Sequence, residues 1–250
     1  MAVERLLRQL WRRALRLVRS DARTRQLHDE VVFWRKWFST RGCEWPDDYR
    51  ERFDPNFPLQ EHIAKYVDQL PDNPVHILDV GAGPLTKLGK VCGSKQLVIT
   101  PIDVLAPQYD ELLNDFRIEP LVRTITGDAE NLVAQFGHKR FNIVHGQNSI
   151  DHTANPLRAI HQMLSVTKPD GFVVLFHAEN EGENEGYNQL HKWDFTCENG
   201  HFLVKGPGPD GSTVNVTDLL DSVGAVDCSV AYGGIKVAIR KRRLHSSSGQ

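Results

Sequence analysis

Short apolar runs alternate with helical patterns along most of the chain. Five such runs, bounded mostly by glycine, proline or aspartate, cover residues 75–83, 95–103, 120–128, 141–147 and 171–180. Between the last two, residues 155–166 have apolar positions at helical spacing, and the sequence Lys-Pro-Asp-Gly that follows is typical of a turn. This alternation predicts an α/β fold with a parallel sheet that helices cover on both faces. Ligands of such open sheets bind at the carboxyl ends of the strands.

The N-terminus has a different pattern. On a helical wheel of residues 3–19, the apolar residues gather on one side: Val3, Leu6, Leu7, Leu10, Trp11, Ala14, Leu17 and Val18. Arginines 5, 8, 12, 13, 16 and 19 occupy the other side. A basic amphipathic helix of this kind is typical of an anionic membrane surface. Two alternatives remain open: a helix that packs on its own domain or on a second subunit, and an arginine-rich transit peptide.

The chain is expected to have three regions. Residues 28–38 predict a second helix with a buried aromatic side, and residues 45–58, rich in proline and aspartate, predict a linker or a lid. Residues 1–58 would therefore form an N-terminal helical extension, and residues 59–243 the α/β domain. Residues 244–250 are expected to be a disordered tail.

Composition and charge narrow the possible classes of protein. A chain of 250 residues with 40% hydrophobic content can bury a core without disulfides or a structural metal. The four cysteines are far apart, and neither a signal peptide nor an apolar run of about 18 residues is visible, so a reducing, cytoplasmic setting is expected. Residues 1–25 carry a net charge of +6 and the rest −8, within a total of −2. An acidic body argues against a nucleic-acid partner.

A glycine loop, Asp-Val-Gly-Ala-Gly-Pro at residues 79–84, follows the first run. Glycines let the backbone approach a ligand closely. A dinucleotide-binding loop would have a third glycine where this chain has Thr86, and Pro84 removes one N–H that would meet a pyrophosphate. The Walker pattern is also absent. A nicotinamide oxidoreductase is therefore disfavoured, whereas an adenosine ligand without phosphates fits.

Two further acids end the next two predicted strands. Asp103 lies where a carboxylate accepts hydrogen bonds from ribose hydroxyls, and Asp128 lies within reach of an adenine amino group. Either residue alone is more simply explained as a turn or helix-cap aspartate. Three signals in order at the ends of consecutive strands favour an adenosine site.

These motifs resemble those of class I S-adenosylmethionine (SAM)-dependent methyltransferases. The segments that carry the resemblance are HILDVGAGP, the acid in PIDVLA, GDAENL, and FNIVHGQNSIDHTANPLRAIHQMLSVTKPDGFVVLF. The last of them is the most specific and is similar to the small-molecule branch. The resemblance covers residues 59–240. It implies a Rossmann-like, doubly wound sheet of seven strands with the last antiparallel, in which residues 171–176, 227–233 and 235–241 supply strands five to seven.

The resemblance also implies roles for individual residues. Asp79 would hold the amino-acid end of SAM indirectly, and Gly81, Ala82 and Gly83 would line its methionine part. The remaining cofactor residues would be Asp103 and Val104 at the ribose, Asp128 and Ala129 at the adenine, and Gln147 and Asn148 beside the sulfonium. The chain departs from the family at Leu85, where many members have a third glycine.

The acceptor is harder to predict. Gln147-Asn148-Ser149-Ile150 stands where an enzyme acting on DNA bases would have Asp/Asn/Ser-Pro-Pro-aromatic, so such a substrate is disfavoured. His152, preceded by Asp151, is a candidate base for a hydroxyl acceptor, or else it only orients the loop. In residues 179–195, the glutamates 179, 181, 183 and 185 could hold a divalent cation, but their spacing does not resemble a metal loop. They are interpreted as solvated loop charges, and no metal ligands are assigned. His191 and Trp193 are candidate sugar-binding residues, with core packing the alternative for the tryptophan.

The His-x-Trp segment, together with FWRKWFSTRG and WPDDYRERFDP upstream, resembles methyltransferases of bacterial surface-glycan clusters. It implies O-methylation of a sugar or glycan-precursor hydroxyl, in the cytoplasm and peripheral to the cytoplasmic membrane face. Two alternatives are kept: a methyltransferase for a natural product, quinone or lipid, and a protein that binds SAM without transferring methyl. The oligomeric state is not predicted.

Overall fold

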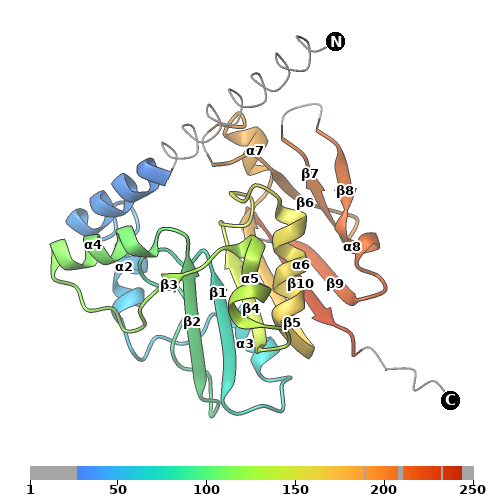
Figure 1. Cartoon of the computed structure of the whole chain (residues 1–250), viewed down its shortest axis with the longest axis horizontal. Coiled ribbons are helices and arrows are strands. Elements are labelled where there is room, and N and C mark those ends of the chain that lie inside the picture. Colours follow the sequence, from blue (N-terminus) through green and yellow to red (C-terminus); the bar gives the residue numbers. More distant parts are fainter. Residues whose placement is uncertain (1–26, 189, 208–210, 232, 244–250) are drawn as a thin grey trace, which may run out of the picture.

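The computed structural model describes residues 27–188, 190–207, 211–231 and 233–243. Its centre is a seven-stranded sheet with the order β3-β2-β1-β4-β5-β10-β9 (Figure 1). The strands are β1 Val75–Val80, β2 Leu97–Asp103, β3 Ile125–Thr126, β4 Phe141–Gln147, β5 Thr167–Ala178, β9 Gly224–Ala231 and β10 Gly234–Lys241. The first five pair in parallel, and β10, the last strand in the chain, is antiparallel to both its neighbours. The predicted fold class is confirmed.

Helices and a second, smaller sheet surround this centre. The helices are α2 Pro46–Phe53, α3 Glu61–Val67, α4 Ala106–Phe116, η1 Ala129–Asn131, α5 Leu132–Phe136, α6 Pro156–Val166, α7 Glu181–Asn184 and α8 Val216–Leu219, preceded by a helix over residues 27–40. The second sheet is antiparallel and consists of β6 Asp194–Glu198, β7 His201–Lys205 and β8 Thr213–Asn215.

Neighbouring residues of the central strands face opposite sides. Leu78 and Val144 pack into one core cluster with residues of α5 and α6, whereas Ile77 and Ile143 pack into another with residues of α3. Because side chains alternate along a strand, an apolar run without polar interruptions is buried on both faces. This explains why continuous runs, and not alternating ones, mark these strands.

The helix over residues 27–40 packs against α4 at one end of the sheet (Figure 1). Its buried aromatic side, predicted from the sequence, is present: Trp34, Trp37 and Phe38 all lie in the core, and Trp37 is 1% exposed. The amphipathic pattern of residues 3–19 lies outside the described residues, as does the predicted tail at 244–250. Their predicted roles stay predictions.

Residues 45–58, predicted to be a linker or a lid, contain the helix α2. Pro46 occupies the first turn, with Asp47 and Asp48 beside it, which favours the start of a helix. The Arg52 guanidinium lies 5.3 Å from the Trp34 ring and 5.5 Å from the Trp37 ring, and it donates a hydrogen bond to the Leu85 carbonyl. The segment is therefore attached to the helix over residues 27–40 and to the glycine loop.

Two predicted strand limits also differ. The third strand was expected over residues 120–128 but is reduced to Ile125–Thr126, because β3 is an edge strand with both side chains exposed. The expected turn before the fifth strand is an irregular part of β5 itself, where the register with β4 shifts. Asp170 there has a φ of 63°, and a Cβ on Gly171 would lie 2.5 Å from the Asn142 carbonyl oxygen.

The sheet β6–β7–β8 was not predicted. Its first hairpin turns at Asn199-Gly200, whose φ angles are 52° and 80°. This dipeptide between strand-like runs is a strong hairpin signal and would have revealed the sheet.

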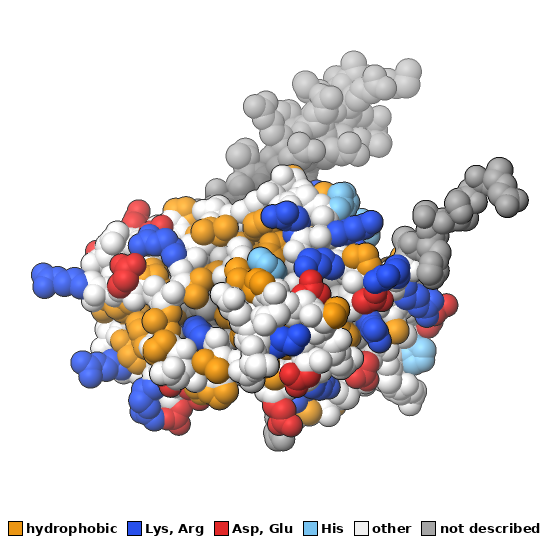
Figure 2. All heavy atoms as spheres, turned by 90° about the horizontal axis from the view of Figure 1, so that it is seen from below, with side chains coloured by type: hydrophobic (Ala, Val, Ile, Leu, Met, Phe, Trp, Pro, Cys, Tyr) orange, Lys and Arg blue, Asp and Glu red, His pale blue; other side chains and the backbone are white. Residues whose placement is uncertain are grey.

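Three surface and covalent features complete the description. All four cysteines are free. Among the described residues, no helix combines the length and apolarity needed to cross a membrane. On the face shown in Figure 2, basic and acidic side chains are interspersed, and no broad basic patch gathers there. The membrane helix suggested for residues 3–19 is not tested by these features.

Candidate functional site

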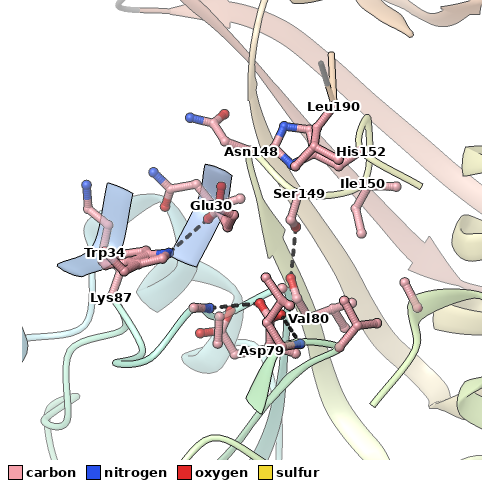
Figure 3. Close-up of a pocket in the computed structure, with 18 of the residues that line it drawn as sticks. Glu30, Trp34, Asp79, Val80, Lys87, Asn148, Ser149, Ile150, His152 and Leu190 are labelled. Carbon is pink, nitrogen blue, oxygen red and sulfur yellow. Dashed lines mark hydrogen bonds between the residues drawn. The ribbon is translucent and has the colours of Figure 1, made fainter. Parts of the chain in front are cut away.

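A cavity of about 730 Å³ opens at the carboxyl ends of β1, β2 and β4 (Figure 3). It is lined by all ten residues that the sequence assigned to the cofactor: Asp79, Gly81, Ala82, Gly83, Asp103, Val104, Asp128, Ala129, Gln147 and Asn148. The structure therefore brings the whole predicted set into one place. We call this part of the cavity the cofactor end.

The glycine loop is tightly enclosed. Gly81 and Gly83 have φ angles of +70° and +65°, a region that favours glycine. A Cβ on Gly81 would lie 2.3 Å from the Cβ of Ser149, and one on Gly83 would lie 2.7 Å from Cζ2 of Trp34. Both glycines are therefore required by the backbone and by their neighbours.

Asp79 connects this loop to its surroundings through two side-chain contacts. Its Oδ2 accepts a hydrogen bond from the Thr86 hydroxyl at 2.6 Å, and its Oδ1 lies 2.7 Å from Nδ1 of His145. The Asp79 side chain is buried, and these two contacts occupy both of its oxygens within the protein. This fits the indirect role implied by the resemblance. It also gives Thr86 a function where a dinucleotide-binding loop would have glycine.

The two strand-end acids differ in their surroundings. Asp103 accepts hydrogen bonds from the backbone N–H groups of Gly83 at 3.1 Å and Leu105 at 2.9 Å, and burial raises its pKa. Asp128 accepts from the N–H of Glu130 at 2.9 Å and so caps η1. The cap role considered for Asp128 is therefore real, and the residue lines the cavity as well.

The helix over residues 27–40 supplies one wall of the cavity, which sequence reasoning missed. Glu30 and Trp34 both line it, and the Trp34 indole N–H donates a 2.8 Å hydrogen bond to Glu30 Oε1 (Figure 3). Burial raises the pKa of Glu30. The sequence offered only a weak signal for this wall: Glu30 precedes Trp34 by one helical turn, on the buried aromatic side of the helix.

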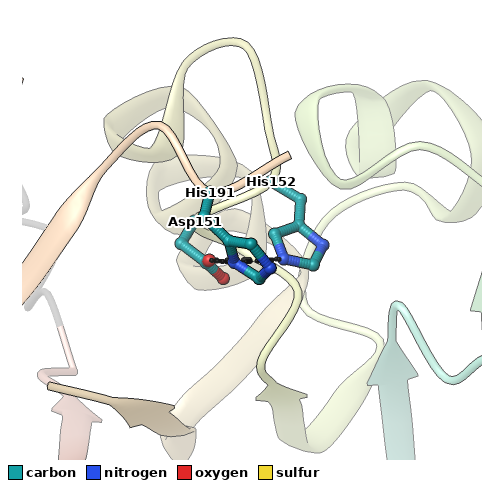
Figure 4. A group of neighbouring side chains, drawn as sticks. All are labelled: Asp151, His152 and His191. Atoms are coloured by element: carbon teal, nitrogen blue, oxygen red, sulfur yellow. Dashed lines mark hydrogen bonds and ion pairs between the residues drawn. The ribbon is translucent and has the colours of Figure 1, made fainter. Parts of the chain in front are cut away.

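At the other end of the cavity, three predicted residues meet in what we call the histidine cluster: Asp151, His152 and His191 (Figure 4). Nε2 of His152 lies 3.2 Å from Nδ1 of His191, and each of these nitrogens lies 3.3 Å from Oδ2 of Asp151. The two histidines line the cavity, whereas Asp151 is 2% exposed beneath them. We call this part the acceptor end.

The cluster contains groups with opposed pKa shifts. Burial lowers the pKa of His152 to about 4, against the nearby Asp151 charge. The hydrogen bond with Asp151 raises the pKa of His191. Burial would raise the pKa of Asp151, but hydrogen bonds from His177 and His191 outweigh it and hold that pKa below its usual range. At neutral pH, Asp151 is thus a carboxylate and His152 a neutral imidazole.

Two acceptor-side predictions need correction. Glu181 is not a solvated loop charge, because it lines the cavity and its Oε1 lies 3.6 Å from Nδ1 of His191. Trp193 does not line the cavity, but packs against the main core, and its indole N–H donates to the Thr153 carbonyl at 3.0 Å. The alternative of core packing is therefore correct for this tryptophan.

Comparison with known proteins identifies the domain that contains the cavity. Residues 78–175 match the family model of a methyltransferase domain. The chain therefore contains a SAM-dependent methyltransferase domain. This methyltransferase uses SAM as its cofactor, as the sequence predicted. No match was found among curated proteins.

Solved structures share the fold of this methyltransferase. A chain from the complex of the Haloferax volcanii Trm112 methyltransferase activator with a methyltransferase is 12% identical, with a TM-score of 0.52 over 87% of this chain and 98% of that one. A SAM-dependent methyltransferase from Methanosarcina mazei is 21% identical over 75% and 100%, with a TM-score of 0.46. The CurJ carbon methyltransferase is 17% identical, with a TM-score of 0.49 over 72% of this chain and 52% of that one.

The cofactor end fits SAM in its chemistry. Two carboxylates, Asp103 and Asp128, lie on the cavity wall, where hydroxyl and amino groups of an adenosine find acceptors. The loop around Gly81 offers backbone without side chains, and a volume of about 730 Å³ lies in the range typical of cofactor sites. These residues would hold the cofactor, and Asn148 lies on the side of His152 (Figure 3).

Proposed function

We propose that this methyltransferase transfers the methyl group of SAM to a hydroxyl oxygen of a sugar, within a glycan precursor. One observation carries the proposal: the two histidines of the cluster line the same cavity as the cofactor residues. An acceptor bound at the cluster would therefore lie next to the methyl donor. Alignment of the two reactants is the largest contribution that such an enzyme makes.

Bound SAM supplies a methyl group on a positively charged sulfur, which accepts the bonding electrons and leaves as the thioether of S-adenosylhomocysteine (SAH). The protein has to present an oxygen nucleophile to that carbon. The cluster carries nitrogen and carboxylate lone pairs that weaken the O–H bond of an acceptor, so that the proton leaves as the O–C bond forms. His152, the base predicted from the sequence, belongs to this cluster together with His191.

The lining of the acceptor end favours a sugar over an apolar acceptor. His152, His191, Glu181 and Asn148 present polar groups there, beside the apolar side chains of Ile150 and Leu190. Hydroxyl groups of a sugar are matched by such donors and acceptors. A quinone or lipid tail would leave several of these polar groups without partners, which costs free energy.

The proposal includes the membrane. The amphipathic pattern of residues 3–19 suits attachment to the cytoplasmic membrane face, and a lipid-linked glycan precursor would be presented there. This part rests on the sequence pattern alone.

Two measurements test the function in turn. The first is calorimetric titration of the full chain with SAH, with NAD as a control, and micromolar binding of SAH alone is expected. The second is mass spectrometry of candidate sugar acceptors incubated with the enzyme and methyl-labelled SAM, where a product 14 Da heavier is expected. Absence of SAH binding would overturn the cofactor assignment. SAH binding without transfer to any hydroxyl acceptor would favour a protein that binds SAM without catalysis.

A further inference from the structure

Three ligand-type atoms of the histidine cluster form a nearly equilateral triangle. Its corners are Nε2 of His152, Nδ1 of His191 and Oδ2 of Asp151, and its edges measure 3.2, 3.3 and 3.3 Å. Each atom carries a lone pair when it is not protonated. All three contacts are short enough to need a proton or a cation between the atoms.

Protons cannot satisfy the whole triangle. An ionised carboxylate brings none, and each imidazole nitrogen brings at most one. If both nitrogens carry a proton, the contact between His152 and His191 places two N–H groups against each other. If only one carries a proton, the other nitrogen directs its lone pair at the Asp151 oxygen. At least one edge is therefore repulsive in every neutral arrangement of the two imidazoles.

A single cation satisfies all three edges. Ligands at about 2.1 Å from a metal are about 3.0 Å apart at octahedral angles and about 3.4 Å apart at tetrahedral angles. The observed edges of 3.2, 3.3 and 3.3 Å fall between these values. An ion above the plane of the triangle would thus contact the three atoms without any rearrangement.

The surroundings of the triangle resemble those of a metal site. The second Asp151 oxygen lies 3.2 Å from Nδ1 of His177, a contact that fixes the orientation of the carboxylate, as outer partners of metal ligands do. Glu181 Oε1 lies 3.6 Å from His191 Nδ1, and its Oε2 is buried without a hydrogen-bond partner. Glu181 therefore offers a fourth oxygen beside the triangle.

We propose that Asp151, His152 and His191, with Glu181 beside them, bind a divalent transition-metal ion such as Zn²⁺. Two imidazoles with one or two carboxylates suit Zn²⁺ and its first-row neighbours, whereas Mg²⁺ and Ca²⁺ prefer oxygen ligands alone. The proposal assigns metal ligands where the sequence analysis assigned none. It deepens the proposed function and rests on it only for the role of the ion, because binding itself depends on the cluster alone.

The role follows from the position of the ion. Both histidines line the cavity, so the coordination positions opposite the triangle face the acceptor end. A hydroxyl oxygen bound there is polarised, its pKa falls, and its proton passes to water in the cavity as the O–C bond forms. In this arrangement the two histidines act as ligands and not as bases.

The test uses the full chain without a polyhistidine tag, stripped with a chelator. Calorimetry with Zn²⁺ and visible absorption with Co²⁺ are expected to show one ion per chain. The double variant His152→Gln/His191→Gln is expected to weaken binding by at least about a hundredfold, since loss of an outer partner alone costs 10–100-fold. His201→Gln is the matched control, because His201 lies 3.4 Å from Asp218 in an exposed pair elsewhere, and this variant should bind like the wild type.

SAH titration of the same samples separates the two proposals. If SAH binds but Zn²⁺ and Co²⁺ do not, or if their binding survives the double variant, the metal site is wrong and the cofactor assignment stands. If one ion binds at the cluster and SAH does not bind, the metal site stands and the proposed function fails. Binding of one ion that the double variant loses and His201→Gln keeps confirms the site.

Discussion

The two ends of the cavity are built in different ways. At the cofactor end, Asp79 and Asp103 lie at the carboxyl ends of β1 and β2, and Asp128 comes just after β3. The glycine loop follows β1 directly. At the acceptor end, Asp151 and His152 follow β4, whereas His191 comes from the segment between α7 and β6. The first end needs only the sheet. The second needs two distant segments to meet.

This difference indicates where the protein is general and where it is specialised. The carboxyl ends of parallel strands share one edge, so any chain with this sheet has positions for a cofactor there. The segment with Glu181, Leu190 and His191 lies between β5 and β6, and it brings several of the groups that line the acceptor end. Variants should therefore separate cofactor binding from methyl transfer.

The largest expected effect is at the acceptor end. The double variant His152→Gln/His191→Gln should lower the rate of methyl transfer by about 10²–10⁴-fold, because activation of the hydroxyl is lost. Its affinity for SAH should stay within about twofold of the wild type, as both side chains lie away from the glycine loop. Rates come from product mass spectrometry and affinities from calorimetry. A comparable loss of SAH affinity would show that the two ends are not separate.

The next largest effect is expected at the glycine loop. Gly81→Ala should weaken SAH binding by roughly a hundredfold, since the left-handed backbone costs a residue with a Cβ roughly 1–2 kcal/mol and the added carbon overlaps Ser149. Gly93→Ala is the matched control, with a φ of +50° and nothing within 4 Å of the added Cβ. It should lose a little thermal stability and no affinity. If both variants lost SAH affinity equally, backbone strain alone would explain the loss, and contact with Ser149 would not be needed.

A smaller effect is expected at Asp103. Asp103→Ala should weaken SAH binding by roughly 1.5–3 kcal/mol, because the ribose hydroxyls lose a charged partner. Asp115→Ala, at an exposed ion pair with Arg35, should have no effect on the same titration. Wild-type affinity in the Asp103 variant would place the ribose elsewhere.

The burial of Asp103 should make SAH affinity depend on pH. Because its pKa is raised, Asp103 takes up a proton as the pH falls before an ordinary aspartate does, and SAH affinity should fall with it. Asp103→Asn should remove that part of the dependence. Glu30→Gln should keep it, although burial raises the pKa of Glu30 as well. Calorimetric SAH affinities of both variants, measured over a range of acidic pH values, show which of the two carboxyls causes the pH dependence.

The smallest effect on SAH affinity is expected from a deletion at the N-terminus. Deletion of residues 1–20 should leave SAH affinity unchanged, since the residues described as lining the cavity, from Leu27 onward, are all retained. The same deletion should release the protein from anionic liposomes in a sedimentation assay. If the full-length protein never binds such liposomes, the amphipathic pattern serves packing and not a membrane.

The sequence by itself determined the sheet and the cofactor end. Buried strands need apolar side chains on both faces, and glycine is needed where the backbone turns at Gly81 and Gly83, so these features appear as local patterns. The seven-stranded sheet with an antiparallel last strand followed from the resemblance and was confirmed. Limits were wrong where the tertiary environment overrides local preference, as at the edge strand β3.

Only the tertiary structure decided the walls of the cavity and the acceptor end. The contact between His152 and His191 spans 39 positions, and no periodicity links residues that far apart. Glu30 and Trp34 line the cavity because their helix packs on α4, while Trp193 turns into the core instead. Local patterns record which side of an element is buried. Which element it is buried against depends on how the whole chain packs.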